Sequence, residues 1–462
     1  MSTQVIGRTL DEIPLYREGV SDDESVLRFQ EDPIGFHLRA FRQLGPIYAT
    51  YFRKRTWVVL AGLEANDFVW RNWKIWDYSE ANAPFLDEMG IDHVTALDGE
   101  HHRDKRTILK PAFDQAPATR FLPEFHRLLE DELRKASQVR IELTKFWAKV
   151  ITKINSRTVA CAEIADDVIE RMTEWEYQML RGLFLDDGRT SYIERERYRA
   201  LKAETFAWLR KIVDERLANP GLYDDNFAAT LKARAAHEGG SADRDRLVND
   251  LYLILLAGTD NTSSLINSAL ILVAAYPEWL GALREELDLW DGRDIRALAQ
   301  MPRLKASILE TQRIRPGIFA LGKNAGEDFE FEGYRVPAGT DVLHVNTLGH
   351  FLEEVYEEPF RFKPERFLEQ DKFVPKTFGL FGGGPHVCLG RNHSLMQTPI
   401  AVAQAIRNYD IMFEEPPEKH VRVGYAGSRV HQELWVKLVP RPVVDAMVLV
   451  RLPDSSNLTA NE

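Results

Sequence analysis

The sequence predicts a mainly α-helical protein with a small β region, an α+β fold organised as one large domain. Helical patterns fill most of residues 64–291. Short segments rich in β-branched and aromatic residues, which favour strands, occur near both ends of the chain. No repeat with a period of 20–50 residues and no low-complexity linker divides the sequence. Because strands from opposite ends favour one interwoven unit, we expect residues 1–462 to form a single domain.

The composition restricts the classes of function. Of the 462 residues, 44% are hydrophobic and 28% are charged, as in a soluble globular protein. The formal net charge of −12 argues against general nucleic-acid binding, which requires a basic face. The two cysteines, Cys161 and Cys388, cannot build a disulfide framework, and this usage is typical of a reducing compartment. We expect Cys161, which lies in a helical stretch, to be an ordinary core residue.

The two ends of the chain are expected to lie outside the main pattern. Residues 1–32 are polar and acidic, without the apolar run of a leader peptide or a membrane span. We therefore expect a cytoplasmic protein without a membrane anchor. Residues 441–462 end in a polar stretch and are left unassigned.

Local sequence patterns predict where individual strands and helices lie. A hairpin is expected over residues 47–61, with β-rich segments at 47–52 and 56–61. Further strands are expected at 329–339, 341–345 and 434–439. Clear helices are expected at 123–135, 193–217, 302–315 and 391–407, the third of which ends before a proline.

The longest uninterrupted helical pattern runs from Leu247 to Tyr276, about 45 Å at 1.5 Å per residue. It is apolar almost all round, which predicts burial through the centre of the domain. Its middle, residues 257–264, is a polar block that contains a glycine. Polar groups in a buried helix are costly unless they are hydrogen-bonded or functional. The block is therefore either a kink, in which Ser and Thr bond back to the preceding turn, or part of a site.

A glycine-rich loop from Phe381 to Gly390 precedes the last expected helix and contains Cys388. Glycines have no Cβ, so the backbone there can turn tightly and approach a ligand. The partial positive charge of a helix N-terminus favours a thiolate over a thiol. Three interpretations are open: a small buried residue in a turn, a nucleophile with His386 or His393 as its base, or an axial thiolate ligand of haem iron.

The loop pattern Phe-x-x-Gly-x-His-x-Cys-x-Gly resembles the haem-ligand loop of the cytochrome P450 family. Upstream, Glu310 and Arg313 and then the segment 362–367, Phe-Lys-Pro-Glu-Arg-Phe, resemble two further motifs of that family in the same order. The resemblance spans about residues 33–438. It implies the cytochrome P450 fold, a haem b (iron protoporphyrin IX) cofactor and Cys388 as the axial ligand of its iron, in a loop that includes Phe381 and Gly390.

Family membership also implies a structural network. Glu310, Arg313 and Arg366 would form a buried cluster of charges that braces the haem loop. Pairs of this kind are weak when they are solvated. Their expected role is therefore structural rather than catalytic.

The two haem propionates require basic groups. His102 and Arg106, one helical turn apart, resemble the pair on the family's C helix that reaches one propionate through charge-assisted hydrogen bonds. His386 matches the loop histidine that binds a propionate. Lys323 stands where many relatives have an arginine, so the compact ammonium group of lysine replaces a planar guanidinium group there.

The polar block of the long helix resembles the family's distal signature, in which an acid precedes an alcohol. Gly258 and Asp260 match this signature. Asn261 stands where the family usually has the threonine of a proton relay, and Thr262 follows it. An amide donates and accepts hydrogen bonds, but it does not relay a proton as a hydroxyl does. We therefore expect Asp260 and ordered water to deliver protons while Asn261 positions them.

The implied activity is that of a haem-thiolate monooxygenase, which inserts one oxygen atom from O2 into an apolar organic substrate. Terpenoids, steroids, fatty acids and polyketides all suit such a pocket. By analogy with the family, residues 80–96 would cap the pocket and residues 316–321 would line it. The contact candidates are Ala257, Phe319 and Leu321.

Electrons are expected from separate partners, a ferredoxin and its NAD(P)H-dependent reductase, because the sequence shows no flavin or ferredoxin segment. A basic patch of Arg103, Lys105, Lys110 and Arg391 would suit an acidic ferredoxin. Two alternatives stay open. One is a haem-thiolate enzyme that uses peroxide or rearranges its substrate, to which the unusual Asn261 points. The other is a non-catalytic haem sensor or binding protein.

Overall fold

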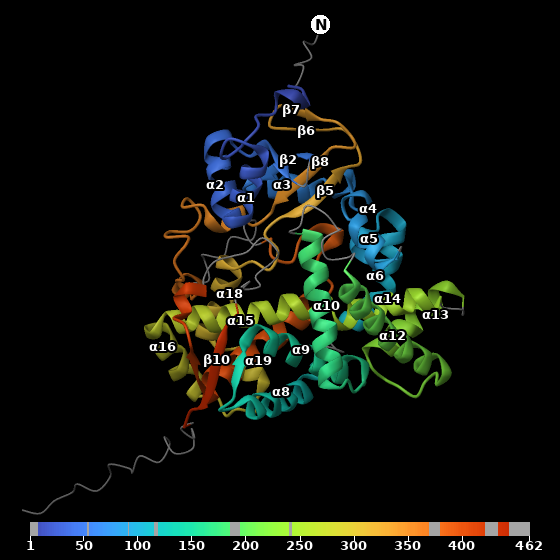
Figure 1. Cartoon of the computed structure of the whole chain (residues 1–462), viewed down its shortest axis with the longest axis vertical. Coiled ribbons are helices and arrows are strands. Elements are labelled where there is room, and N and C mark those ends of the chain that lie inside the picture. The colour runs from blue at the N-terminus through green and yellow to red at the C-terminus, as the bar shows by residue number, and fades with distance from the viewer. Residues whose placement is uncertain are drawn as a thin grey trace, which may run out of the picture.

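The computed structural model of the protein describes residues 8–52, 55–90, 92–114, 119–184, 195–239, 243–368, 379–420 and 433–442. Most of the chain is helical, and the strands form three small sheets. Figure 1 shows the largest sheet at one end of the molecule beside α1, α2 and α3, with the remaining helices filling the body. The expectation of a mainly helical fold with a small β region is therefore confirmed.

The largest sheet joins segments from the two ends of the chain. Its strand order is β1-β2-β8-β5-β3, and the bounds are β1 Ile47–Phe52, β2 Arg55–Ala61, β8 Asp341–Val345, β5 Leu321–Ala325 and β3 Trp76–Asp77. β1 and β2 form the expected antiparallel hairpin, with Ile47 opposite Leu60. β2 also pairs in parallel with β8, with Val58 opposite Val342. The blue and orange strands thus lie side by side in Figure 1.

Two smaller sheets complete the β structure. One has the antiparallel order β4-β10-β9, with bounds Arg140–Glu142, Trp435–Pro440 and Tyr409–Phe413. The other is the hairpin of β6 (Phe329–Phe331) and β7 (Tyr334–Val336). The strands expected at 329–339, 341–345 and 434–439 are confirmed, apart from short differences at their ends.

The helices have the following bounds. The first group is α1 Asp22–Glu31, α2 Pro33–Leu44, α3 Leu63–Arg71, α4 Tyr78–Ala81, α5 Ala83–Met89 and α6 Gly99–Phe113. The middle group is α8 Leu122–Ala136, α9 Leu143–Ala160, α10 Asp166–Phe184, α12 Glu196–Ala218 and α13 Asn226–Glu238. The last group is α14 Arg244–Leu255, α15 Thr259–Ala275, α16 Pro277–Asp288, α17 Ile295–Leu298, α18 Pro302–Ile314 and α19 Arg391–Asn408. The helices expected at 123–135, 302–315 and 391–407 are confirmed, and so is the described part of the one at 193–217.

The long central helix is interrupted at the polar block, where the sequence left a kink open, so the expectation of one continuous helix over residues 247–276 is wrong. α14 ends at Leu255 and α15 starts at Thr259, with a turn over residues 256–258 between them. Within this turn the amide of Thr259 donates to the carbonyl of Leu256, a bond between residues three apart. Gly258 favours such a break because it has no side chain to hold the helical conformation. The turn overlaps the start of the polar block at residues 257–264, so the polar block coincides with a break in the helix.

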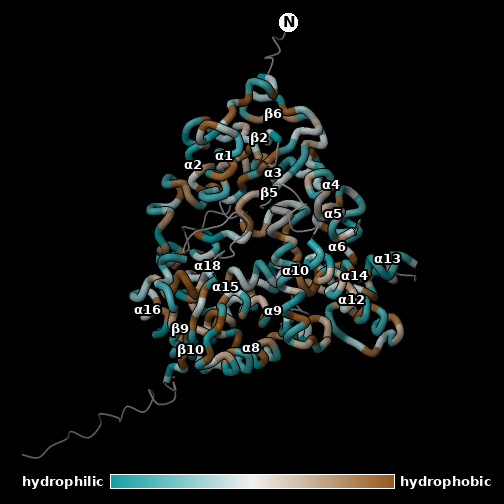
Figure 2. Tube along the Cα trace, in the orientation of Figure 1, coloured by the Kyte–Doolittle hydropathy of each residue, from teal (hydrophilic) through white to brown (hydrophobic). Residues whose placement is uncertain are grey.

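Hydrophobic clusters position the central helix within the body. α15 packs against α9 and α19 in one large cluster that includes Trp147, Ile271 and Ile406. α14 belongs to a second cluster with α10 and α12. Along helices near the surface, such as α8, brown and teal stretches alternate (Figure 2), as expected for helices with one buried face.

Cys161 is a correction to the sequence analysis. It is exposed, because α9 ends at Ala160 and Cys161 forms the left-handed C-cap with φ of 42°. Asp225 and Arg216 lie near it, and partial burial raises the pKa of its thiol. It is therefore a surface cysteine and not part of the core.

No single helix in the described part of the chain is both long and apolar enough to cross a membrane. The segment Arg244–Ala275 with Pro277–Asp288, bent by 113°, passes that test by length and composition alone.

Candidate active site

The loop from Phe381 to Gly390 is closed by its own backbone. The amide of Cys388 donates to the carbonyl of Phe381 at 2.8 Å, which folds the loop back on itself. Gly382 and Gly384 have φ of 70° and 62°, in the left-handed region that favours glycine. A Cβ on Gly383 would lie 2.7 Å from the ring of Trp70 on α3, so this position also requires glycine. The glycines therefore allow a tight loop that packs directly on α3.

Cys388 stands two residues before Gly390, the N-cap of α19. The residue is accessible to a small molecule, although protein encloses it. This burial raises the pKa of its thiol, while the amides of Gly390 and Arg391 and the guanidinium of Arg106 act in the opposite direction. The amides at the helix N-terminus therefore lower the pKa of the Cys388 thiol, as expected, but burial has the larger effect. Binding of a metal ion would supply the missing stabilisation, since thiolates are the form that ligates metals.

α6 brings His102 and Arg106 to the cysteine loop. Arg106 Nη1 donates to the carbonyl oxygen of Val387 at 2.7 Å, next to Cys388. His102 is buried, and its Nε2 has no hydrogen-bond partner among the described residues. Burial, together with Arg106, lowers the pKa of His102 to about 4. The imidazole is thus neutral at pH 7 and has one ring nitrogen available for another group.

Three rings form a stack beside the loop. His386 lies between Tyr78 and His102, with centroid distances of 3.6 and 3.7 Å. Lys323, on β5, donates from Nζ to the Tyr78 hydroxyl at 2.9 Å. Burial lowers the pKa of Lys323 to about 7 and that of His386 to about 3. Side chains from four separate segments therefore converge at this point.

This donor set fits a haem with its propionates. The Lys323 ammonium, the Arg106 guanidinium, the Tyr78 hydroxyl and His102 Nε2 are all suited to an anionic oxygen. Asp98 is the acid nearest to this group, and its carboxylate already accepts from the amides of Tyr78 and Ser79. An accessible cysteine at the adjacent loop completes the ligands that a haem iron with two carboxylates requires.

Glu310, Arg313 and Arg366 meet in a buried cluster. Arg313 forms two hydrogen bonds to the Glu310 carboxylate, at 2.7 and 2.8 Å, and Arg366 Nε approaches it at 3.1 Å. Arg366 lies on a short 3-10 helix, η5 (Pro364–Phe367), which packs on α18. Arg313 also donates to the carbonyl of His350 at 2.6 Å. The cluster therefore ties residues 362–367, which we call the meander segment, to α18, and Glu310 is its central acid.

The distal residues lie at the start of α15. Asp260 and Thr262 are buried, whereas Gly258 and Asn261, three residues apart, are exposed on an otherwise buried helix. Asn261 faces the segment 316–321, because a Cβ on Gly317 would lie 3.3 Å from Asn261 Oδ1. The amide of Thr262 donates to the carbonyl of Gly258 at 3.0 Å. The helix thus presents an amide, not a hydroxyl, toward that segment.

The pocket candidates divide into two groups. Ala257 and Leu321 are half-buried. Phe319 is a correction: it is 2% exposed and packs in the core next to α2, 5.7 Å from the ring of His37. Its neighbour Ile318 is 42% exposed. Residues 315–320 form neither helix nor strand, and within this irregular segment Phe319 turns inward while Ile318 turns outward.

One of the four residues expected in the basic surface patch is buried. Arg103, Lys110 and Arg391 are exposed, but Lys105 is 3% exposed. Its ammonium lies 2.5 Å from both Asp92 and Asp250. Lys105 therefore belongs to a buried network that links the segment after α5 to α6 and α14, and not to the surface patch.

The segment 80–96, expected to cap the pocket, is tied to α12. Glu88 accepts from the Tyr198 hydroxyl at 2.6 Å and from Lys202 at 2.7 Å. Asp92 is held by Lys105 and by Arg234 on α13. Residue 91 and the side chains of 84, 85 and 87 lie outside the described residues. The described contacts hold this segment against three helices.

Tyr78 is the site residue that the sequence did not reveal. It follows β3 and belongs to no motif, so only its position beside Lys323 and His386 indicates a role. We expect Tyr78→Phe to lower the affinity for haem roughly tenfold, since outer-shell partners contribute about 10–100-fold to metal-site affinity. The measurement is haem occupancy per chain under limiting haem, with Tyr51→Phe on β1 as the matched control. Equal occupancy of the two variants would exclude this role.

Comparisons with known proteins agree with this arrangement. The family model described as cytochrome P450 matches residues 26–424. A sterol 14α-demethylase from Mycolicibacterium vanbaalenii is 24% identical over 427 residues, covering 88% of this chain and 93% of its own length. The putative cytochrome P450 135B1 of Mycobacterium bovis is 27% identical over 376 residues, 78% of each chain. The structure of retinoic-acid-bound cyanobacterial CYP120A1 superposes with a TM-score of 0.79 at 21% identity, covering 90% of this chain and 96% of that one.

Proposed function

Because this chain belongs to the cytochrome P450 family, an oxidoreductase family that carries haem b, we propose that it is a monooxygenase of an apolar organic substrate. The observation that supports this most directly is the convergence at one loop. Cys388 and His386 of this loop, Arg106 of α6, Tyr78 of α4 and Lys323 of β5 come from four segments, yet they bring a thiol and a set of anion-binding groups together. Bound through Cys388, the haem supplies the reductive activation of dioxygen.

The protein residues have distinct proposed roles. Tyr78, Lys323, His102, Arg106 and His386 bind and orient the propionates, and Phe381 and Gly390 shape the loop around the thiolate. Asp260 delivers protons through ordered water, since it is the buried acid of the polar block. Asn261 positions that water or the substrate, and Thr262 supports the same turn. Glu310, Arg313 and Arg366 hold the meander segment in place.

The substrate is proposed to be a terpenoid, steroid, fatty acid or polyketide. Relatives of low identity include a protein named for sterol demethylation and one solved with retinoic acid, both of which act on or bind apolar molecules. In this chain Ala257, Ile318 and Leu321 are the proposed contacts, with Ile318 in place of Phe319. Residues 80–96 cover the pocket.

Redox partners are a general requirement of bacterial relatives, and we assign a ferredoxin with its NAD(P)H-dependent reductase to this chain. Three exposed cations, Arg103, Lys110 and Arg391, lie on α6 and at the start of α19, the helices that carry Arg106 and follow Cys388. They would meet an acidic ferredoxin near the thiolate. Residues 1–462 are assigned to one domain, because β2 and β8 pair across the length of the chain.

The distal residues give a specific prediction. Asp260→Asn should lower turnover roughly 100-fold, the lower end of what a positioned general acid contributes. Asn261→Thr should change the share of electrons lost as peroxide, because a hydroxyl would then face Gly317. Product and peroxide are measured together, and Asp245→Asn, at the exposed start of α14, is the control. Unchanged product yield and peroxide in both distal variants would exclude these roles.

The proposed function is tested by titrating the haem-loaded protein with terpenoids, steroids and fatty acids while the Soret band is recorded. A shift to shorter wavelength with one class identifies the substrate class and supports an open distal site. Turnover with peroxide alone, without reductase, would instead favour the peroxide-using alternative that Asn261 suggests. A normal haem spectrum that no ligand shifts, with no turnover under either condition, would contradict both and leave a binding protein.

A further inference from the structure

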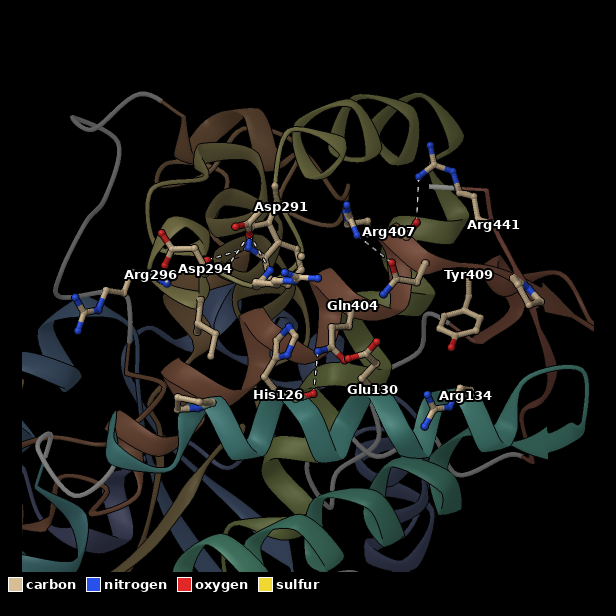
Figure 3. A pocket seen from close by; sticks show the side chains of 17 residues that line it. His126, Glu130, Arg134, Asp291, Asp294, Arg296, Gln404, Arg407, Tyr409 and Arg441 are labelled. Carbon is tan, nitrogen blue, oxygen red and sulfur yellow. Dashed lines mark hydrogen bonds between the residues drawn. The ribbon is translucent and has the colours of Figure 1, made fainter. Parts of the chain in front are cut away.

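A second cavity lies at the far end of the helix that follows the cysteine loop. It measures about 700 Å³ and is bounded by α8, the loop between α16 and α17, the C-terminal end of α19 and the end of β10 (Figure 3). Gln404, the first residue of α19 that lines the cavity, follows the start of the helix at Arg391 by 13 residues, so about 20 Å of helix separates the cavity from the Cys388 loop. It is therefore distinct from the haem site.

Arginine side chains are frequent in the lining of this cavity, although the chain has a net charge of −12. Five arginines and three carboxylates line it, and Arg134 and Arg441 form ion pairs with Asp131 and Asp288, which lie outside the lining. Two of those carboxylates accept hydrogen bonds from backbone amides within the loop. Asp291 accepts from the amides of Arg293 and Asp294, and Asp294 caps α17 by accepting from the amide of Arg296. Arg293 and Arg296 form no ion pair within the described part of the chain. The guanidinium groups of Arg293 and Arg296 are thus available to a ligand.

The opposite wall carries a buried polar group without a partner. Gln404, on α19, is 1% exposed, and its Nε2 donates to the carbonyl of His126 at 3.0 Å. Because a carbonyl only accepts, the amide group of Gln404 must have this orientation. Its Oε1 then has no hydrogen-bond partner among the described residues, and in Figure 3 the side chain lies in the cavity between His126 and Glu130. A buried acceptor of this kind favours a ligand that carries a donor.

The neighbouring histidine adds a second polar atom. His126 Nε2 is buried and has no partner among the described residues. Burial lowers the pKa of His126, against the opposing effect of Glu130, so the ring adds no charge at pH 7. The ring packs edge-on against Trp290, with 5.6 Å between the ring centroids, so the indole holds the imidazole in place.

We propose that this cavity binds a small anion that also carries a hydroxyl group, such as a hydroxycarboxylate or a polyol phosphate. Arg293 and Arg296 hold the anionic group, since guanidinium forks match both carboxylate and phosphate. The ligand hydroxyl donates to Gln404 Oε1. The site lies apart from the haem site, and Arg293, Arg296 and Gln404 all line this one cavity.

Calorimetric binding to the full-length, haem-loaded protein tests this with two matched pairs of probes. Citrate is compared with tricarballylate, which has the same carboxylates without the hydroxyl. Glycerol 3-phosphate is compared with propyl phosphate. The hydroxylated member of one pair should bind about fivefold more tightly, the equivalent of roughly 1 kcal/mol for one hydrogen bond. The pair that shows this difference distinguishes a carboxylate ligand from a phosphate ligand.

Substitutions of the lining residues test whether the anion binds in this cavity. Arg293→Gln should weaken the preferred anion about tenfold, because a charge-assisted bond is lost. Arg71→Gln, an exposed arginine on α3, should leave the affinity unchanged. Gln404→Met keeps the side-chain size and should remove the preference for the hydroxyl, with folding checked by the Soret band. The absence of saturable binding by any probe, or binding that Arg293→Gln leaves intact, would overturn the proposal.

Discussion

Replacement of Cys388 by serine is expected to abolish the thiolate-type Soret absorption and to reduce turnover to background. A serine hydroxyl remains protonated at neutral pH, so it cannot replace a thiolate that donates electron density to iron. The substitution changes one atom within a loop whose backbone bond from Cys388 to Phe381 is unaffected. The effect therefore reports on iron ligation and not on loop folding. The measurement is the absorption spectrum of the reduced carbon monoxide complex, recorded with turnover.

The chain contains its own control for this experiment. Cys161 is the second cysteine, and it is exposed at the C-cap of α9. Cys161→Ser should leave both the spectrum and the turnover unchanged. If Cys388→Ser retained a thiolate-type spectrum, or if Cys161→Ser lost it, the assignment of Cys388 as the axial ligand would be wrong.

Replacement of Glu310 by alanine should destabilise the protein by about 3–5 kcal/mol, the usual cost of breaking a buried ion pair by removal of one partner. Glu310 and Arg313 are fully buried, and Arg366 shares the same carboxylate. Without Glu310 both guanidinium groups keep their charge and lose their only anion in this cluster. Glu310→Gln keeps the side-chain volume and some hydrogen bonds, so it should cost less. Urea unfolding of the haem-loaded protein measures the difference.

A matched exposed pair provides the comparison. Glu358 and Arg361 are also three residues apart and 3.2 Å from each other, but they are 46% and 58% exposed. Glu358→Ala should cost much less than Glu310→Ala, because solvent screens such pairs. An equal loss in the free energy of unfolding for Glu310→Ala and Glu358→Ala would show that burial of the Glu310 cluster adds nothing to stability.

Local features were predictable from the sequence. The residues from Phe381 to Gly390 form a short glycine-rich loop, and the helix after it starts as expected, because loop and helix signals depend on neighbours in sequence. Glu310 and Arg313 are three residues apart on one helix, so their proximity follows from helix geometry alone. The addition of Arg366 came from the family resemblance and not from spacing.

Contacts between distant segments were not predictable. Tyr78 meets Lys323 through the pairing of β3 with β5, which no local pattern indicates. Lys105 has the sequence context of a surface residue, yet it is buried because two acids from other segments surround it. Phe319 was expected in the pocket but packs in the core, because a short irregular segment has no periodicity from which the direction of a side chain can be predicted. In each case tertiary packing determines where the side chain lies and whether it is buried, which the local sequence does not show.

The parallel pairing of β2 with β8 has a consequence for how the chain is made. Val58 leaves the ribosome long before its partner Val342, by on the order of 10–60 s at ordinary elongation rates. During that interval β2 has β1 as its neighbour but an open second edge, the kind of edge that recruits other strands. Cys388 is synthesised later still, so haem uptake must follow almost complete translation. Protection of the nascent edge, for example by a chaperone, thus becomes a determinant of how much active enzyme a cell obtains.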